Sequence, residues 1–386
     1  MVNKDISAKL GSIEGEICEY IKRCKGEASY LHHRIQTVIC PNPNSAAGMK
    51  TCVIGNRNNV DIVETETPHI SEGDMLIEMR ACGICGTDIE KVRGNYSSRI
   101  LGHEAVGVVA KTGARVKNFQ VGDRVFPHHH VPCYQCHYCR RGSETMCPHF
   151  SRSNLDPGGL SEYFRVPEWN VERNAVFRIP DTMNFRTAAL IEPFACVVRS
   201  LGKTVLNDGD TAAVVGVGPV GLMHVAALKL YGRCRIAAVD VSKSRLGFAG
   251  EIGAGFTFGP AESVEGVLSI TDGIGADTVF VATGNRDAIA AALAMVRKGG
   301  RVIQFGLPPP GLALPADYSE IFKREISIVS TYSAVEKDVE KAIRIIAGDT
   351  ANFEKLISHT FRLENAREAF DLAEKADDAR KIVIEG

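Results

Sequence analysis

Four cysteines lie close together in the segment CYQCHYCRRGSETMC, at positions 133–147. They are Cys133, Cys136, Cys139 and Cys147. This Cys-x2-Cys-x2-Cys-x7-Cys spacing lets a loop fold back so that four thiolates surround one zinc ion at about 2.3 Å. Because four sulfur ligands leave no position for a reactant, the predicted zinc is structural and would stabilise the loop. The alternative is four unliganded thiols crowded on one loop.

A second group of possible metal ligands lies upstream, in CGICGTD at 82–88 and GHE at 102–104. Cys85, His103 and Glu104 combine a thiolate, an imidazole and a carboxylate. Fewer than four protein ligands leave zinc one position for water or substrate, which is typical of a catalytic site. Taken singly, each residue could instead be a buried or hydrogen-bonded structural residue.

The glycine pattern GVGPVG at 216–221 has the form of a dinucleotide-binding turn. Its glycines would permit a tight bend, close approach of a pyrophosphate and close packing of a helix on a strand. Asp240 has the spacing of a ribose-binding carboxylate and would repel the extra phosphate of NADP, which favours NAD. Arg245 and Lys243 could contact the adenosine ribose, tolerate a phosphate, or simply be solvated. The predicted cofactor-binding residues are Gly216, Gly218, Val220, Gly221, Asp240 and Arg245.

These glycines belong to an alternation of predicted strands and helices that begins near residue 201. Strands are predicted at 211–218, 235–240, 276–284 and 301–307, with helices at 219–232, 242–253 and 286–300. The strands are apolar throughout, which indicates a parallel sheet covered on both faces. The sequence therefore predicts an α/β doubly wound domain, whose last strand is the ISIV run at 326–329.

The composition of the chain limits the classes of function that it could have. The chain has 386 residues, 45% hydrophobic and 24% charged, which suits roughly two globular domains. The 45 basic and 46 acidic side chains give no electrostatic footprint for nucleic acid or a membrane surface. No run approaches the ~18 apolar residues of a membrane span, and no secretory signal opens the chain. Twelve cysteines are few for a disulfide scaffold, so a cytoplasmic protein acting on a small molecule is predicted.

The first 48 residues differ from the rest. A helix is predicted over about residues 6–25, followed by the loop-like CPNPNSAAG at 40–48, and a strand begins at Met49. We expect the functional domain to begin at Met49. The extension could be an extra helix, an interaction arm, or the product of an upstream start codon.

From Met49 to Gly386 the chain resembles the zinc-dependent medium-chain dehydrogenase/reductase family, in particular its alcohol and polyol dehydrogenases. CGICGTD, GHEAVGVV, GDRV, the four-cysteine segment, GGLSEYFRVP, IEPFA and GVGPVGL follow the family's order and approximate spacing. The resemblance implies a GroES-like, mainly-β catalytic domain at 49–194 with a zinc lobe at 133–147. It also implies a Rossmann domain at 195–333, a return to the catalytic domain at 334–386, and a homodimer or homotetramer.

Carried over from the family motif, Cys85, His103 and Glu104 are expected at the catalytic zinc. Glu192 in IEPFA stands where alcohol dehydrogenases place a cysteine and polyol dehydrogenases a glutamate, which indicates the polyol and sugar branch. Whether Glu104 or Glu192 contacts zinc directly stays open. Asp88 matches a carboxylate that orients the zinc histidine, although it could also cap a helix.

Thr87 matches the hydroxyl that receives the substrate's proton. Many relatives have a histidine three positions later, where this chain has Glu90, which could relay a proton, bind a substrate hydroxyl, or be a solvated helix residue. In PHHHVPC at 127–133, His129 falls where relatives line the substrate pocket. Adjacent histidines in an extended segment point to opposite faces and do not readily converge on one ion.

The resemblance implies an NAD-dependent enzyme that transfers hydride from a secondary hydroxyl of a polyol, sugar or cyclitol, with one catalytic and one structural zinc. An amino-alcohol substrate, such as threonine or an amino-cyclitol, is the first alternative. A zinc- and NAD-binding module without turnover is a more distant one, and an intact open metal site argues against it. A quinone reductase of the same fold would lack the zinc residues.

Overall fold

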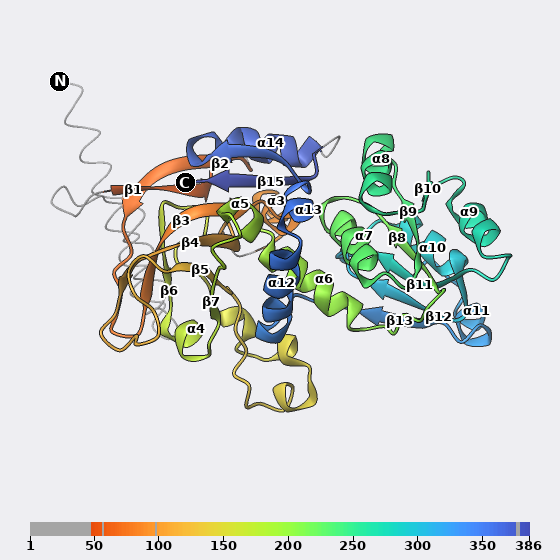
Figure 1. The fold of residues 1–386 in the computed structure, drawn as a ribbon, viewed down its shortest axis with the longest axis horizontal. Helices are drawn as coiled ribbons and strands as arrows, with labels where there is room; N and C mark the ends of the chain where they lie inside the picture. Colours follow the sequence, from red (N-terminus) through yellow and green to blue (C-terminus); the bar gives the residue numbers. More distant parts are fainter. Residues whose placement is uncertain (1–47, 56–57, 97–98, 376–378) are drawn as a thin grey trace, which may run out of the picture. The chain divides into compact units, whose positions relative to one another are not determined.

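The computed structural model describes residues 48–55, 58–96, 99–375 and 379–386 (Figure 1). The chain divides into two compact units, residues 1–50 with 64–67, and residues 51–63 with 68–386. Every site considered below lies in the second unit. The helix predicted over residues 6–25 lies outside the described residues. The first strands, β1 (Gly48–Ile54) and β2 (Val60–Glu66), form a two-stranded sheet.

A seven-stranded sheet carries the residues expected at the catalytic zinc. Its order is β14-β15-β3-β4-β5-β7, with β6 also paired to β3. The pairs are antiparallel, except that β14 runs parallel to β15. The strands are β3 (Met75–Gly83), β4 (Glu104–Thr112), β5 (Arg124–Pro127), β6 (Tyr163–Val166), β7 (Val176–Arg178), β14 (Ile357–Arg362) and β15 (Lys381–Glu385).

A six-stranded, all-parallel sheet has the order β10-β9-β8-β11-β12-β13. Alternate residues of β8 enter two different apolar clusters, Ala212 and Val214 one, Ala213 and Val215 the other, so both faces are covered by helices. The strands are β8 (Thr211–Val215), β9 (Arg235–Val239), β10 (Phe256–Phe258), β11 (Ala276–Val281), β12 (Val296–Gln304) and β13 (Ser327–Ser330).

The helices of this domain are α7 (Pro219–Tyr231), α8 (Lys243–Ile252), α9 (Ser263–Ile270), α10 (Arg286–Met295) and α11 (Tyr318–Lys323). The predicted doubly wound fold and its last strand are confirmed. Two details of the prediction are wrong. The helix expected to reach residue 300 ends at Met295, because β12 begins at Val296, and the short β10 and α9 were not foreseen.

Two helices connect the sheets and pack against each other, α6 (Ile191–Leu201) and α12 (Glu336–Gly348). The remaining α-helices of the described residues are α3 (Gly86–Val92), α4 (Glu168–Glu172), α5 (Phe185–Ala188), α13 (Thr350–Glu354) and α14 (Ala366–Lys375). The 3-10 helices are η1 (Cys139–Arg141), η2 (Glu144–Met146), η3 (Phe150–Arg152) and η4 (Leu363–Asn365). Within the described residues, no helix combines the length and the apolar character that crossing a bilayer requires. The predicted domain boundaries stay predictions.

Candidate active site and metal centres

Strand register brings the upstream metal residues together. β3 and β4 pair antiparallel with Gly83 opposite Glu104. Cys85 therefore follows the end of one strand at the point where His103 precedes the start of the next. Gly102, which comes directly before His103, has φ +77°, and a side chain there would overlap Leu160, so the tight entry into β4 requires glycine.

Cys85, His103 and Glu104 form one compact ligand group. One potential ligand atom from each lies within 4.8 Å of the other two. Glu104 Oε1 is fully buried and has no hydrogen-bond partner among the described residues. A buried, unpartnered carboxylate oxygen beside a thiol and an imidazole is what a zinc ion with an open coordination position would satisfy. The residues present therefore fit a catalytic metal.

The carboxylate of Asp88 contacts the imidazole of His103 at Nδ1. Its Oδ1 lies 3.3 Å from His103 Nδ1, and its Oδ2 accepts from the backbone N–H of Cys85 at 3.3 Å. Burial alone would raise the pKa of Asp88, but His103 and neighbouring donors lower it to about 2. Burial likewise opposes protonation of His103, yet the charges of Asp88 and Cys85 hold its pKa well above the usual range. Asp88 therefore lies where its carboxylate can orient the imidazole of His103.

Lys381 is a site residue that the sequence reasoning missed. It is only 2% exposed, contacts Glu104 Oε2, and donates from Nζ to the carbonyl of Ile84 at 2.9 Å. Burial raises the pKa of Glu104, while Lys381 opposes the rise. Gly83 makes room for this pair, because a Cβ there would overlap both side chains. A lysine inside KIVIE, a strand buried at its first four residues, was the available signal.

Glu192 is not a member of the close ligand group. It lies in the first turn of α6, is 5% exposed, and accepts a hydrogen bond from Cys196 Sγ at 3.6 Å. Its charge nevertheless reaches Glu104, whose pKa it raises in addition to burial. Cys196, one helical turn along, was not foreseen as a partner.

Thr87 and Glu90 both lie on α3, but in different surroundings. Thr87 is half-buried between Cys85 and Asp88. The carboxylate of Glu90 is paired with Arg93 Nη1 at 2.8 Å and accepts from the side-chain amide of Asn95. Thr87 thus lies on α3 two residues after Cys85, whereas the carboxylate of Glu90 is engaged by Arg93 and Asn95.

The three adjacent histidines face three different partners. His128 Nδ1 lies 2.9 Å from Glu336 Oε1, and His130 Nδ1 lies 2.9 Å from the carbonyl of Ser153. The ring of His129 lies 5.0 Å from that of His103, and its buried Nδ1 has no hydrogen-bond partner among the described residues. Burial lowers the pKa of His129 well below the usual range, so its ring is neutral near pH 7. His129 is the histidine that adjoins the metal group.

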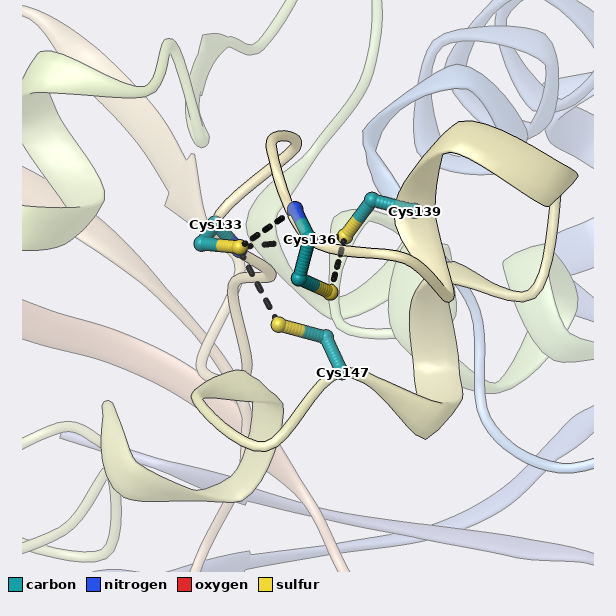
Figure 2. Close-up of side chains that lie close together, drawn as sticks. All are labelled: Cys133, Cys136, Cys139 and Cys147. Carbon is teal, nitrogen blue, oxygen red and sulfur yellow. Dashed lines mark hydrogen bonds between the residues drawn. The ribbon is translucent and has the colours of Figure 1, made fainter.

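The four cysteines of the lobe converge with their sulfur atoms turned inward (Figure 2). A tetrahedron of sulfurs about 2.3 Å from zinc has edges of about 3.8 Å. The Sγ atoms of Cys136 and Cys139 are 3.5 Å apart, and those of Cys133 and Cys139 are 4.0 Å apart. Hydrogen bonds from the N–H of Gln135 and other backbone groups lower the pKa of Cys133 to about 6. These thiols fit a closed, structural zinc site.

The lobe is anchored on the start of α12. Arg199, near the end of α6, lies 3.3 Å from Asp338 and 3.9 Å from Glu144, which precedes Cys147 by three residues. Lys337 donates to Glu144 at 2.7 Å. One buried cluster joins Cys139, Cys147, Phe150 and Val335. These charged contacts were not foreseen, because the partners lie far apart in the sequence: Arg199 and Asp338 by 139 residues, and Lys337 and Glu144 by 193.

The glycine turn has the shape of a pyrophosphate cradle. Gly216 has φ +86° directly after β8, and a Cβ on Gly221 would overlap Gly216 O. Gly218 precedes α7, whose first turn holds Pro219 and Val220. The backbone is thus free to approach a phosphate at the helix N-terminus.

Asp240, after β9, is 8% exposed and accepts from the N–H groups of Val217 at 2.7 Å and Ser242 at 2.9 Å. Arg245 Nη1 lies 3.8 Å from where a Cβ of Gly218 would be. Its Nη2 donates to the carbonyl of Ala379 at 3.3 Å. Both predicted cofactor side chains therefore adjoin the glycine turn, and the set fits a dinucleotide.

Comparison with known proteins places the chain in a family. Residues 71–181 match the model of the alcohol dehydrogenase GroES-like domain, and residues 219–348 match that of zinc-binding dehydrogenases. The chain is 33% identical over 336 residues to sorbitol dehydrogenase of Bacillus subtilis, covering 84% of this chain and 93% of the relative. The chain therefore belongs to the zinc-dependent medium-chain dehydrogenases.

Two further relatives are informative. L-threonine 3-dehydrogenase of Bacillus velezensis is 30% identical over 349 residues, covering 87% of this chain and 99% of the relative. A solved alcohol dehydrogenase of Escherichia coli CFT073, in complex with NADH, superposes with a TM-score of 0.79 at 27% identity, covering 88% and 100% of the two chains. The predicted fold class, enzyme class and zinc and dinucleotide cofactors are confirmed. The chain is a zinc-dependent oxidoreductase of alcohols or polyols.

Proposed function

We propose that this enzyme oxidises a secondary hydroxyl of a polyol, sugar or cyclitol with NAD, at a zinc held by Cys85, His103 and a glutamate. The observation that carries the proposal is the convergence of Cys85, His103 and Glu104 in one compact group, near the buried Glu192. When bound, zinc supplies a Lewis acid that acidifies the substrate hydroxyl, and NAD supplies the hydride acceptor.

Three protein residues would prepare this reaction. Thr87, on the first turn of α3, receives the proton of the substrate hydroxyl. Asp88 holds Nδ1 of His103, which fixes the orientation of the imidazole that faces the metal. Asp240 binds the ribose of the cofactor, and its negative charge disfavours NADP. The four-cysteine lobe takes no part in the chemical step.

Two observations support a polyhydroxylated substrate over an amino alcohol. His129 offers a buried, unpartnered ring nitrogen next to His103, which suits a substrate hydroxyl. An ammonium group would need a carboxylate, but Glu90 is already paired with Arg93 and Asn95.

We also propose a homodimer or homotetramer in the cytoplasm. β13 is an edge strand of the six-stranded sheet, and most of its residues are exposed, including Ile328 at 40%. An exposed edge of this kind can pair with the same strand of a second copy. A reducing compartment would suit the nine described cysteines, none of which forms a disulfide.

A substrate panel tests the proposal. The zinc-loaded protein is incubated with NAD, and separately with NADP, in the presence of sorbitol, xylitol, a cyclitol, threonine or ethanol, and formation of the reduced cofactor is followed by absorbance. Turnover with NAD on a polyol or cyclitol supports the proposal. Turnover confined to threonine would favour the amino-alcohol alternative, and a preference for NADP would contradict the role given to Asp240.

A further inference from the structure

Lys91 is a cation behind the catalytic metal group. It lies on α3, one helical turn after Thr87, and only 11% of its side chain is exposed. Its Nζ donates to the carbonyl of Ile100 at 2.8 Å and lies 3.5 Å from Asp88 Oδ1. Its ammonium is therefore directed at the carboxylate that holds His103.

Three nitrogen atoms lie around one oxygen of that carboxylate: the N–H of Gly102 and Lys91 Nζ donate hydrogen bonds to it, and His103 Nδ1 is an ion-pair contact. Asp88 Oδ1 lies 3.3 Å from His103 Nδ1, 3.3 Å from the N–H of Gly102 and 3.5 Å from Lys91 Nζ. An oxygen atom offers two lone pairs, so the three nitrogen atoms compete for them. The interaction of Asp88 Oδ1 with Lys91 therefore weakens its interaction with His103.

The division of that charge affects the metal. A carboxylate that hydrogen-bonds the second nitrogen of a ligating histidine raises the basicity of the histidine, which strengthens the metal–ligand bond. A stronger donor also leaves the metal a weaker Lewis acid. Lys91 opposes both effects, first by drawing on Asp88 and second by adding a positive charge near the metal group.

We propose that Lys91 is a positioning residue that weakens the interaction of Asp88 with His103. A catalytic zinc bound there would then be a stronger Lewis acid, but it would be bound less tightly. The inference rests on the proposed function, since it assigns a metal to Cys85, His103 and Glu104. Lys381 has the corresponding place beside Glu104, so the ligand carboxylate of Glu104 and the carboxylate of Asp88 beside His103 each pair with a lysine.

The test is zinc affinity, measured apart from turnover. Zinc is titrated out of the wild-type protein, K91M, K91Q and K91R with a chelator of known affinity, and the zinc content is read by atomic absorption. The single tryptophan, Trp169, which stacks on His149 beside the four-cysteine lobe, reports loss of the lobe metal separately. K323M is the matched control, because Lys323 pairs with Glu320 three residues earlier on a helix, but at an exposed position.

We expect the catalytic zinc to bind about tenfold more tightly in K91M and K91Q, with kcat lowered, and K91R and K323M to resemble the wild type. A purely structural role for Lys91 would instead loosen the metal. Equal or weaker affinity in the folded K91M or K91Q protein overturns the inference while leaving the proposed function intact. A wild-type chain that binds zinc at the four-cysteine lobe but not at Cys85, His103 and Glu104 overturns both.

Discussion

At the scale of single residues, the stability of the metal group depends on a buried ion pair between Lys381 and Glu104. Lys381 and Glu104 are 2% and 0% exposed, and the lysine also donates to Ile84. Removal of one member of a buried ion pair leaves the other charge uncompensated, which typically costs about 3–5 kcal/mol.

K381M should therefore lower the free energy of unfolding by about 3–5 kcal/mol, measured by urea denaturation, whereas the double variant E104Q/K381M should lose less. R297M is a suitable control, because Arg297 pairs with Asp277 at a partly exposed position and should cost under about 1 kcal/mol. Equal stability of K381M and the wild type would show that Glu104 needs no counter-charge.

The residues that sequence reasoning found are those whose chemistry is recognisable from type and spacing. Cys85, His103 and the four lobe cysteines belong to short motifs, so their neighbours are fixed locally. Lys381 and Cys196 gave no such signal. Lys381 is 297 residues from Ile84, and only the pairing of β15 with β3 brings it to the site.

At the scale of elements, the fluorescence of one tryptophan can report the conformation of the four-cysteine lobe. Trp169 donates from Nε1 to the carbonyl of Val131 at 3.0 Å and stacks on His149, so it touches the chain on both sides of the lobe. The guanidinium carbon of Arg173 lies over the indole ring, 3.2 Å from its centroid.

Loss of the lobe metal, in C139S, should therefore shift the tryptophan emission to longer wavelength, because the loop loses its cross-link and water reaches the indole. C85S, which removes only a catalytic ligand, should leave the emission unchanged. Fluorescence spectra of the two variants decide the matter, and an unaltered spectrum in C139S would mean that the lobe holds its shape without metal.

Helix α7 contains a buried histidine that makes stability depend on pH. His224 Nδ1 donates to the carbonyl of Val220 at 2.7 Å, and Nε2 lies 3.1 Å from Ser200 Oγ. Burial lowers the pKa of His224 from 6.5 to about 4, although the bond to Val220 opposes the change. Between these pH values the unfolded chain binds the proton more readily than the folded one, so acid favours unfolding.

The contribution of His224 is therefore fully present above pH 6.5 and lost as the pH falls toward 4, by about 3 kcal/mol. Denaturant unfolding of the wild type and H224Q at pH 7 and pH 4.5 should show a steeper loss in the wild type. Parallel losses in the two proteins would contradict a buried neutral imidazole.

The elements themselves were predictable where the hydrophobic pattern was long. β8 is an apolar strand, and α7 begins directly after the glycine turn. Both elements were predicted. β10, with three residues, is too short to give a pattern, and the alanine-rich α10 runs into β12 without a glycine or proline to mark the boundary. The pairing of β12 with β11, a tertiary contact, decides that residues 296–300 are strand.

At the scale of the whole molecule, α6 and α12 connect the two sheets. One sheet ends at the metal group and the other at the glycine turn. The order of the motifs along the chain made this architecture predictable, because each motif belongs to a known position in the family. Assembly and substrate were not, since they depend on exposed edges and pocket side chains that no short motif records.

The central claim is that the group at Cys85 is the catalytic zinc site and that the four-cysteine lobe is not. The most direct test measures zinc content and NADH formation on the same preparations. The wild type should hold two zinc ions per chain and oxidise a polyol. C85S should remain folded, hold one zinc and show no turnover. A folded C85S protein that keeps both zinc ions, or that still reduces NAD at the wild-type rate, would contradict the account.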